Sequence, residues 1–247
     1  MEAGNATPAD GPNDPLPIHL KTADLPRRLV SAAAMLAVAA LAVAIGGAVL
    51  DAFIALVALV AFGEFAVLVT RATPNLGLRV AGWIAGAAYF GFAAAILAGA
   101  GTFLLLMVVG ITVFTDTGAY FAGRALGGPK IAPKISPSKT WAGLAGGMTA
   151  SVAWVFLWVW AMDADLGWPR FELGLNLSVE NVSGAIMLGA GLAVVAQAGD
   201  FLESWLKRRA GVKDSSRLIP GHGGVFDRID GLVPVVLVAG VIASNLV

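Results

Sequence analysis

The acidic residues near the C-terminal end form the pattern with the clearest chemical meaning. Asp200 and Glu203 are three residues apart at the end of an apolar stretch, so on a helix they share one face. Asp227 and Asp230 repeat this spacing where the next apolar stretch begins, with Asp214 between the pairs. Clusters that offer only oxygen ligands suit Mg²⁺, which keeps positions for phosphate and water. The sequence therefore predicts a magnesium site among these carboxylates.

A plainer interpretation is that these acids pair with neighbouring bases. Lys207, Arg208 and Arg228 are interleaved with them and would form a solvated rim at the helix ends. Against this, Asp227 and Asp230 adjoin an apolar stretch, where unpaired charge is costly.

Between the acids lies the run PGHGG, residues 220–224. Its glycines permit backbone conformations closed to other residues, and successive N–H groups in such a turn bind phosphate. His222 is a candidate to bind phosphate or to carry a proton. A glycine-rich turn alone is more often only a turn, but Lys213 and Arg228 flank this one.

A second polar segment, residues 116–140, precedes this region. It begins with Asp116 and continues with lysines and hydroxyl side chains that are donors for phosphate: Lys130, Lys134, Ser136, Ser138, Lys139 and Thr140. The alternative is a basic loop that only attracts anionic lipid. Glu64 stands apart within the apolar run FGEFAVL, where a functional role and a structural pairing with a neighbouring helix are equally open.

These residues are set in a very apolar chain. Apolar residues make up 58% of it and charged residues 13%, and the mean hydropathy is +0.82. Soluble domains carry about a quarter charged residues. The absence of cysteine excludes disulfides and thiolate metal sites, and two distant histidines cannot form a histidine-based zinc site unaided.

A membrane-spanning helix needs about 20 mostly apolar residues. The sequence predicts an all-α polytopic fold with about seven such helices: 29–49, 52–69, 80–99, 102–120, 141–162, 182–201 and 229–247. We expect a disordered cytoplasmic tail over 1–26, N-terminal transmembrane helices over 27–115 and a catalytic membrane region over 116–247. Two cytoplasmic functional segments, 116–140 and 200–230, belong to that last region.

The basic residues set the orientation. With the N-terminal tail in the cytoplasm, every Lys and Arg except Arg170 falls on the cytoplasmic side. Any chemistry should therefore face the cytoplasm. A transporter would instead line a continuous path with charge, and it is often built from duplicated halves that are not evident here.

Around the acids the sequence resembles the CDP-diacylglycerol synthases (phosphatidate cytidylyltransferases). That family's signature is S-x-x-K-R-x4-K-D, then P-G-H-G-G, then D-R-x-D. The matching residues are Ser204, Lys207, Arg208, Lys213, Asp214, Pro220, Gly221, His222, Gly223, Gly224, Asp227, Arg228 and Asp230. The runs DTGAYFAGR and SPSKTW are similar to upstream motifs, and Glu64 resembles an acid of the N-terminal spans. The departures are Ala142 for a usual Glu, Ser215-Ser216 for a usual Gly and Arg209 for a common acid.

The resemblance implies transfer of the cytidylyl group of CTP to phosphatidic acid, with release of pyrophosphate. It implies Mg²⁺, allows a second cation such as K⁺, and implies a homodimer in the inner (plasma) membrane that binds no nucleic acid. Asp200 and Asp227 would bind the metal, joined by Asp214 and Asp230. Lys207, Arg208, Lys213, His222 and Arg228 would act on the phosphates. Further substrate contacts would come from Asp116, Ser136, Lys139, Thr140, Ser204, Gly223 and Gly224.

Two other cytidine-nucleotide enzymes are alternatives. A CTP-dependent kinase of a membrane lipid alcohol would release CDP rather than pyrophosphate. A CDP-alcohol phosphotransferase would carry a D-G-x2-A-R motif, which this sequence lacks.

Overall fold

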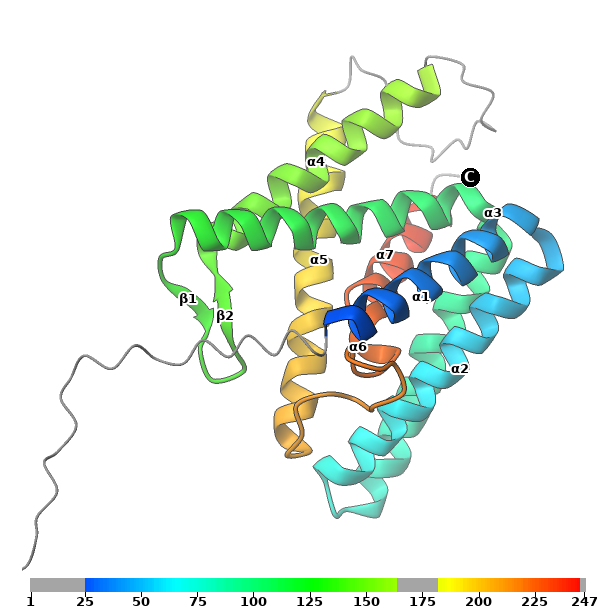
Figure 1. Ribbon diagram of the computed structural model, residues 1–247, viewed down its shortest axis with the longest axis vertical. Helices are drawn as coiled ribbons and strands as arrows, with labels where there is room; N and C mark the ends of the chain where they lie inside the picture. Colours follow the sequence, from blue (N-terminus) through cyan, green and yellow to red (C-terminus); the bar gives the residue numbers. More distant parts are fainter. Residues whose placement is uncertain (1–24, 164–181, 245–247) are drawn as a thin grey trace, which may run out of the picture.

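The protein is a bundle of long helices (Figure 1). The computed structural model describes residues 25–163 and 182–244. Along the chain the elements are α1 (Leu25–Ile45), α2 (Gly47–Ala72), α3 (Leu76–Leu126), β1 (Lys130–Ala132), β2 (Ser136–Thr140), α4 (Trp141–Asp163), α5 (Val182–Arg209), α6 (Phe226–Ile229) and α7 (Leu232–Ser244). The predicted tail lies almost wholly outside the described residues, as does Arg170.

Five helices of the described chain, α1 to α5, are long and apolar enough to cross a membrane. The 51-residue α3 is more than twice the length that a bilayer requires, and it is broken at Gly101, where φ is 72°. Figure 1 shows that the helix changes direction between its two halves. These halves correspond to the predicted spans 80–99 and 102–120. The prediction of an all-α polytopic membrane protein is confirmed.

The last predicted span is interrupted. Instead of one helix over 229–247, the structure has the single turn α6, a turn at Asp230 and Gly231, and then α7. The 13 described residues of α7 span about 20 Å, against a bilayer core of about 30 Å. The interruption places Asp230 at a helix junction, where its carboxylate faces other polar groups.

Small residues bring α3 and α4 together. A methyl group added to Gly118 of α3 would lie 2.5 Å from the carbonyl oxygen of Gly146 on α4. One added to Gly146 would lie 2.2 Å from Ala122 Cβ. Helix backbones approach this closely in lipid only where side chains are small. This contact fixes the end of α3, from which the polar hairpin emerges.

That hairpin occupies the second half of the predicted cytoplasmic segment 116–140. The segment 116–140 is helical as far as Leu126, and β1 then pairs antiparallel with β2, with Lys130 opposite Thr140. Thr140 Oγ1 accepts a hydrogen bond from Gly143 N at 3.0 Å, which caps the start of α4. The hairpin therefore holds Lys139 at a fixed position beside α5.

The short helix α6 is anchored by one aromatic side chain. Phe226 is 2% exposed and packs edge to face against Phe65 of α2 and Phe90 of α3, with ring centroids 5.9 and 5.4 Å away. Such contacts add about 0.5–1.5 kcal/mol to simple burial. They fix the residue that follows, Asp227.

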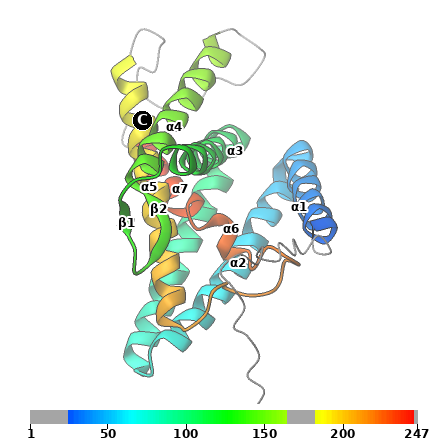
Figure 2. The ribbon, with the colours of Figure 1, turned by 60° about the vertical axis from the view of Figure 1, so that its left-hand side comes forward.

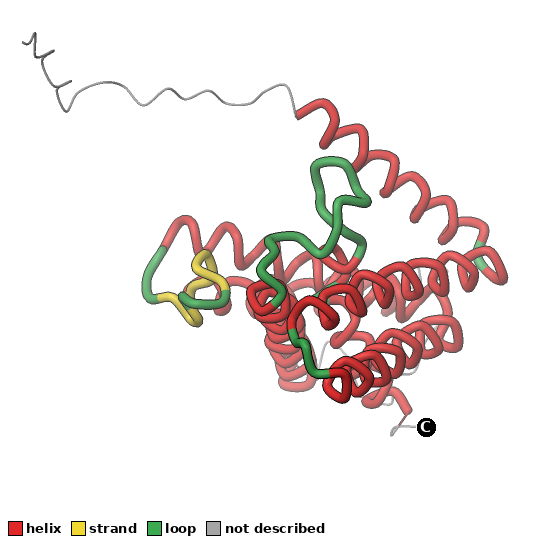
Figure 3. Tube along the Cα trace, turned by 90° about the horizontal axis from the view of Figure 1, so that it is seen from below, coloured by secondary structure: helices red, strands yellow, loops and turns green. Residues whose placement is uncertain are grey.

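The loop that joins α5 to α6 reaches α1, which stands apart from the other helices (Figures 2 and 3). Ser31 of α1 donates a hydrogen bond to the carbonyl oxygen of Pro220 at 2.9 Å, and its Oγ lies 2.9 Å from His222 Nδ1. The N-terminal helices thus contact the glycine-rich loop directly.

Candidate active site

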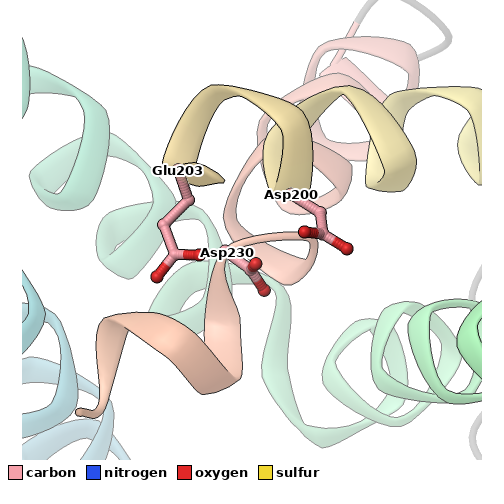
Figure 4. Close-up of side chains that lie close together, drawn as sticks. All are labelled: Asp200, Glu203 and Asp230. Carbon is pink, nitrogen blue, oxygen red and sulfur yellow. The ribbon is translucent and has the colours of Figure 1, made fainter. Parts of the chain in front are cut away.

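Three carboxylates from two parts of the chain meet at the centre of the site (Figure 4). Asp200 and Glu203 project from one face of α5, and Asp230 comes from the turn before α7. One oxygen of each lies within 4.8 Å of the others. We call these three residues the acid trio.

A glycine allows the trio to form. Gly199 precedes Asp200 on α5, and a methyl group added to it would lie 2.2 Å from the carbonyl oxygen of Asp230. The same methyl group would lie 2.6 Å from Pro234 Cγ on α7. Any larger residue at this position would push the turn, and Asp230 with it, away from α5.

The acid trio has the properties of a cation site. The side chain of Glu203 is almost fully buried, and its Oε1 has no hydrogen-bond partner among the described atoms. Burial and the nearby charge of Asp200 raise the pKa of Asp230 to about 7. Buried carboxylate oxygens without donors are costly, and a cation would satisfy them. A set of oxygen ligands alone fits a hard divalent ion.

Two lysines border the trio. Lys207, one turn along α5, forms ion pairs with Glu203 and, at 2.7 Å, with Asp227 Oδ1. Lys139 of β2 forms an ion pair with Asp200 and donates to Gln197 Oε1 at 3.0 Å. The site therefore holds acids for a cation and ammonium groups for an anion side by side.

Asp227 is satisfied by other groups of the protein. Its Oδ2 accepts hydrogen bonds from Gly224 N at 2.7 Å and from Ser215 N and Oγ at 2.9 and 2.8 Å. Burial opposes its ionisation, but hydrogen bonds from Lys207, Gly224 N and Ser215 hold the pKa of this carboxyl well below its usual range. Asp227 is thus a permanent anion that orients Lys207.

The glycine-rich loop folds tightly beside Asp227. Gly221 and Gly223 have φ of 78° and 83°, in the left-handed region that glycine favours. Arg228 donates from Nε and Nη2 to the carbonyl oxygen of His222, at 3.1 and 2.6 Å. The first residue of the loop, Pro220, accepts from Ser31, and the last, Gly224, donates to Asp227, so both of its ends are also held.

The other predicted site residues occupy several positions. Arg208 and Lys213 are exposed, as is Asp214, which lies beside Gly223. Asp116 is near enough to Lys139 and Asp200 for their charges to interact. Ser136 and Thr140 are buried in the hairpin, and Ser204 lies on α5.

The structure groups the acids differently from the predicted metal set. It places Asp200 and Asp230 together with Glu203, and the group does not include Asp214 or Asp227. The roles of those two residues as ligands stay predictions. The sequence contained a signal for Glu203, because its spacing from Asp200 put both on one helix face. It contained no signal that Asp227 would accept hydrogen bonds from Ser215 and Gly224 of the loop.

Comparison with known proteins places this geometry in a family. A model of the cytidylyltransferase family matches residues 83–245, which is well over half of the chain. The chain belongs to this family. The resemblance noted in the motifs is thereby confirmed, and the match includes the whole acid trio, Lys139 and the glycine-rich loop.

Several curated relatives carry the name phosphatidate cytidylyltransferase. The one from Brucella suis biovar 1 (strain 1330) is 45% identical over 159 residues, which are 62% of this chain and 53% of that protein. The Haemophilus influenzae protein is 43% identical over 136 residues (55% and 44%), and the Bacillus subtilis protein 40% over 119 residues (48% and 39%). The chain spans about half the length of the curated relatives it matches. The family, which transfers nucleotidyl groups, and the acid trio together point to a divalent cation.

Proposed function

We propose that this chain transfers the cytidylyl group of CTP to phosphatidic acid, giving CDP-diacylglycerol and pyrophosphate. The observation that carries the proposal is the acid trio bordered by Lys139 and Lys207 at the ends of apolar helices. Such a site could bind a triphosphate and its cation from the aqueous side, and a lipid phosphate from the membrane side. The names of the relatives support the same reaction.

The proposed reaction needs little proton transfer. An oxygen of the phosphatidate phosphate forms a bond to the α-phosphorus of CTP, and the bond from that phosphorus to the bridging oxygen of the β-phosphate breaks. The nucleophile is already an anion, and the leaving pyrophosphate carries its own charge. The protein therefore contributes mainly orientation and charge neutralisation.

Asp200, Glu203 and Asp230 are the residues that would hold Mg²⁺ in this proposal. When bound, Mg²⁺ neutralises phosphate oxygens and stabilises the leaving group. Lys207, fixed by Asp227, and Lys139 supply positive charge to the phosphates from either side of the trio. Ammonium groups that already lie in place lose little freedom when the substrate arrives.

The exposed cations would receive the substrates. Arg208 at the end of α5, Lys213 in the following loop and Arg228 in α6 are exposed, and they would attract CTP and the lipid headgroup. His222, with Nδ1 beside Ser31, would present its other ring nitrogen to a phosphate. We place further substrate contacts on the predicted residues of the hairpin (Ser136, Lys139 and Thr140) and of the glycine-rich loop (Gly223 and Gly224).

We further propose that the protein lies in the inner (plasma) membrane with this site facing the cytoplasm. The support is the confinement of nearly all basic residues to one side of the predicted spans. The resemblance supports a homodimer and leaves room for a second cation such as K⁺.

The deciding assay uses the full chain, purified in detergent, with phosphatidate, radiolabelled CTP and Mg²⁺. We expect labelled CDP-diacylglycerol and one pyrophosphate for each CTP consumed, and no product in EDTA. Release of CDP with a newly phosphorylated lipid alcohol would identify a kinase instead. Absence of any labelled lipid under all these conditions would refute the proposal.

A further inference from the structure

Glu64 is a buried acid in the middle of the apolar helix α2, and it lies outside the family-matched residues 83–245. Its side chain is 8% exposed. In the described part of the chain its carboxylate forms no ion pair, and its partners are neutral donors. A buried carboxylate inside a membrane helix costs free energy, so its presence points to a specific role.

Among the described residues, the donors to Glu64 come from the loop between α5 and α6 and from Phe226, the first residue of α6. Ser215 Oγ and Phe226 N donate to Oε2 at 2.9 and 2.8 Å, while Ser216 Oγ and Val225 N donate to Oε1 at 2.6 and 3.1 Å. One carboxylate thus fastens both ends of the stretch that contains the PGHGG turn.

The fit between Glu64 and the loop is close. A methyl group added to Gly224 would lie 2.1 Å from Ser215 Oγ and 2.4 Å from Glu64 Oε2. Both hydroxyl groups of the pair Ser215-Ser216 contact Glu64, at 2.9 and 2.6 Å.

Contacts lead from Glu64 to the acid trio. Ser215 Oγ lies 2.9 Å from Glu64 Oε2 and 2.8 Å from Asp227 Oδ2, so it bridges the two carboxylates. Asp227 Oδ1 holds Lys207, and Lys207 in turn pairs with Glu203. Every step in this series is a hydrogen bond or an ion pair.

We propose that Glu64 is a positioning residue for the cation site, acting through Ser215, Asp227 and Lys207 on Glu203. It touches neither substrate nor cation. It fixes the loop so that Asp227 keeps Lys207 at the edge of the trio. The inference deepens the proposed function, but its first measurement, cation affinity, does not depend on that function.

The test compares Glu64→Gln with wild type as full-length proteins in detergent, using Mn²⁺ as the probe. Glutamine keeps the size of the side chain but replaces one acceptor oxygen with an NH₂ group. That NH₂ group would face the N–H and O–H groups that now donate to Glu64. We expect Mn²⁺ affinity, followed by electron paramagnetic resonance, to fall roughly 10- to 100-fold, as for other residues that orient metal ligands. We also expect kcat to fall while KM for CTP changes much less. Glu64→Asp, which keeps the charge, should recover part of both losses.

Asp51→Asn is the matched control, because Asp51 is an exposed acid on the same helix. It should bind Mn²⁺ as wild type does. If Glu64→Gln does not fold, Ser215→Ala decides, because it removes only the bridging hydroxyl and leaves Glu64 its other three donors.

Folded Glu64→Gln or Ser215→Ala protein with wild-type Mn²⁺ affinity and wild-type kcat would overturn the inference. That result would leave Glu64 a purely structural residue. If wild type makes no CDP-diacylglycerol, the proposed function fails, and the Mn²⁺ measurement still decides the role of Glu64.

Discussion

Glu203 is the residue at which function and stability conflict most directly. It is buried, Lys207 neutralises one of its oxygens, and the other lacks a donor. Asp200 and Asp230 add further acidic groups nearby. Without a cation this arrangement destabilises the folded protein, as expected where a binding site is prepared in advance of its ligand.

Glu203→Gln should therefore have opposite effects on binding and on stability. Substitution of a residue that only orients metal ligands typically lowers metal affinity roughly 10- to 100-fold. We expect Glu203→Gln to lower Mn²⁺ affinity by at least this factor. In EDTA, however, the melting temperature should rise, because the amide relieves repulsion and still accepts from Lys207. Mn²⁺ titration and thermal unfolding measure the two effects.

Asp214→Asn is the informative comparison for that prediction. Asp214 belongs to the ligand set predicted from the sequence but not to the acid trio. A larger loss of Mn²⁺ affinity in Asp214→Asn than in Glu203→Gln would place the cation on the sequence-based set and contradict the trio.

At the scale of elements, the junction of α5 with the α6–α7 turn determines whether the trio exists. Gly199→Ala should force the Asp230 backbone away, since the added methyl group would lie 2.2 Å from its carbonyl oxygen. We expect a loss of about 1–3 kcal/mol in stability from overpacking, together with weaker Mn²⁺ binding.

The control for this change is on the same helix. A methyl group added to Gly191 would meet nothing within 4 Å. Gly191→Ala should leave Mn²⁺ affinity unchanged and add up to about 1 kcal/mol of helix stability. Equal Mn²⁺ affinity in the two variants would show that the close approach at Gly199 does not control the trio.

Sequence reasoning located most of the elements but not their contacts. The spans were predictable because each needs a run of apolar residues, and Gly101 falls in the gap between two of them. The β1–β2 hairpin was missed because its proline-rich, polar sequence has no alternating apolar pattern. The bond between Glu64 and Ser215 joins residues 151 positions apart, a separation that no local pattern reveals.

At the scale of the whole molecule, a cation should stabilise the entire fold. The trio joins α5 to the start of α7, so a bound ion would link two parts of the bundle. A ligand at about 100 times its Kd contributes about 2.7 kcal/mol to the free energy of unfolding. We expect the melting temperature to rise with Mg²⁺ and to return to its starting value in EDTA.

Na⁺ at equal ionic strength is the control for that measurement, and Glu203→Gln should show a much smaller shift with Mg²⁺. Identical melting temperatures in Mg²⁺, Na⁺ and EDTA would mean that the trio binds no divalent ion in the folded protein.

The ion pair between Lys139 and Asp200 has a consequence for the order in which ligands bind. Without ligands, the ammonium group serves as the counter-ion of a carboxylate that the cation needs. With a cation held by the trio, Lys139 would be repelled and would hold Asp200 more weakly, and its ammonium group would become available to a triphosphate. Because binding free energies are linked reciprocally, the nucleotide must equally raise the affinity for the cation. If the trio holds the cation, the position of Lys139 on the hairpin would make the binding of the two ligands cooperative even where they do not touch.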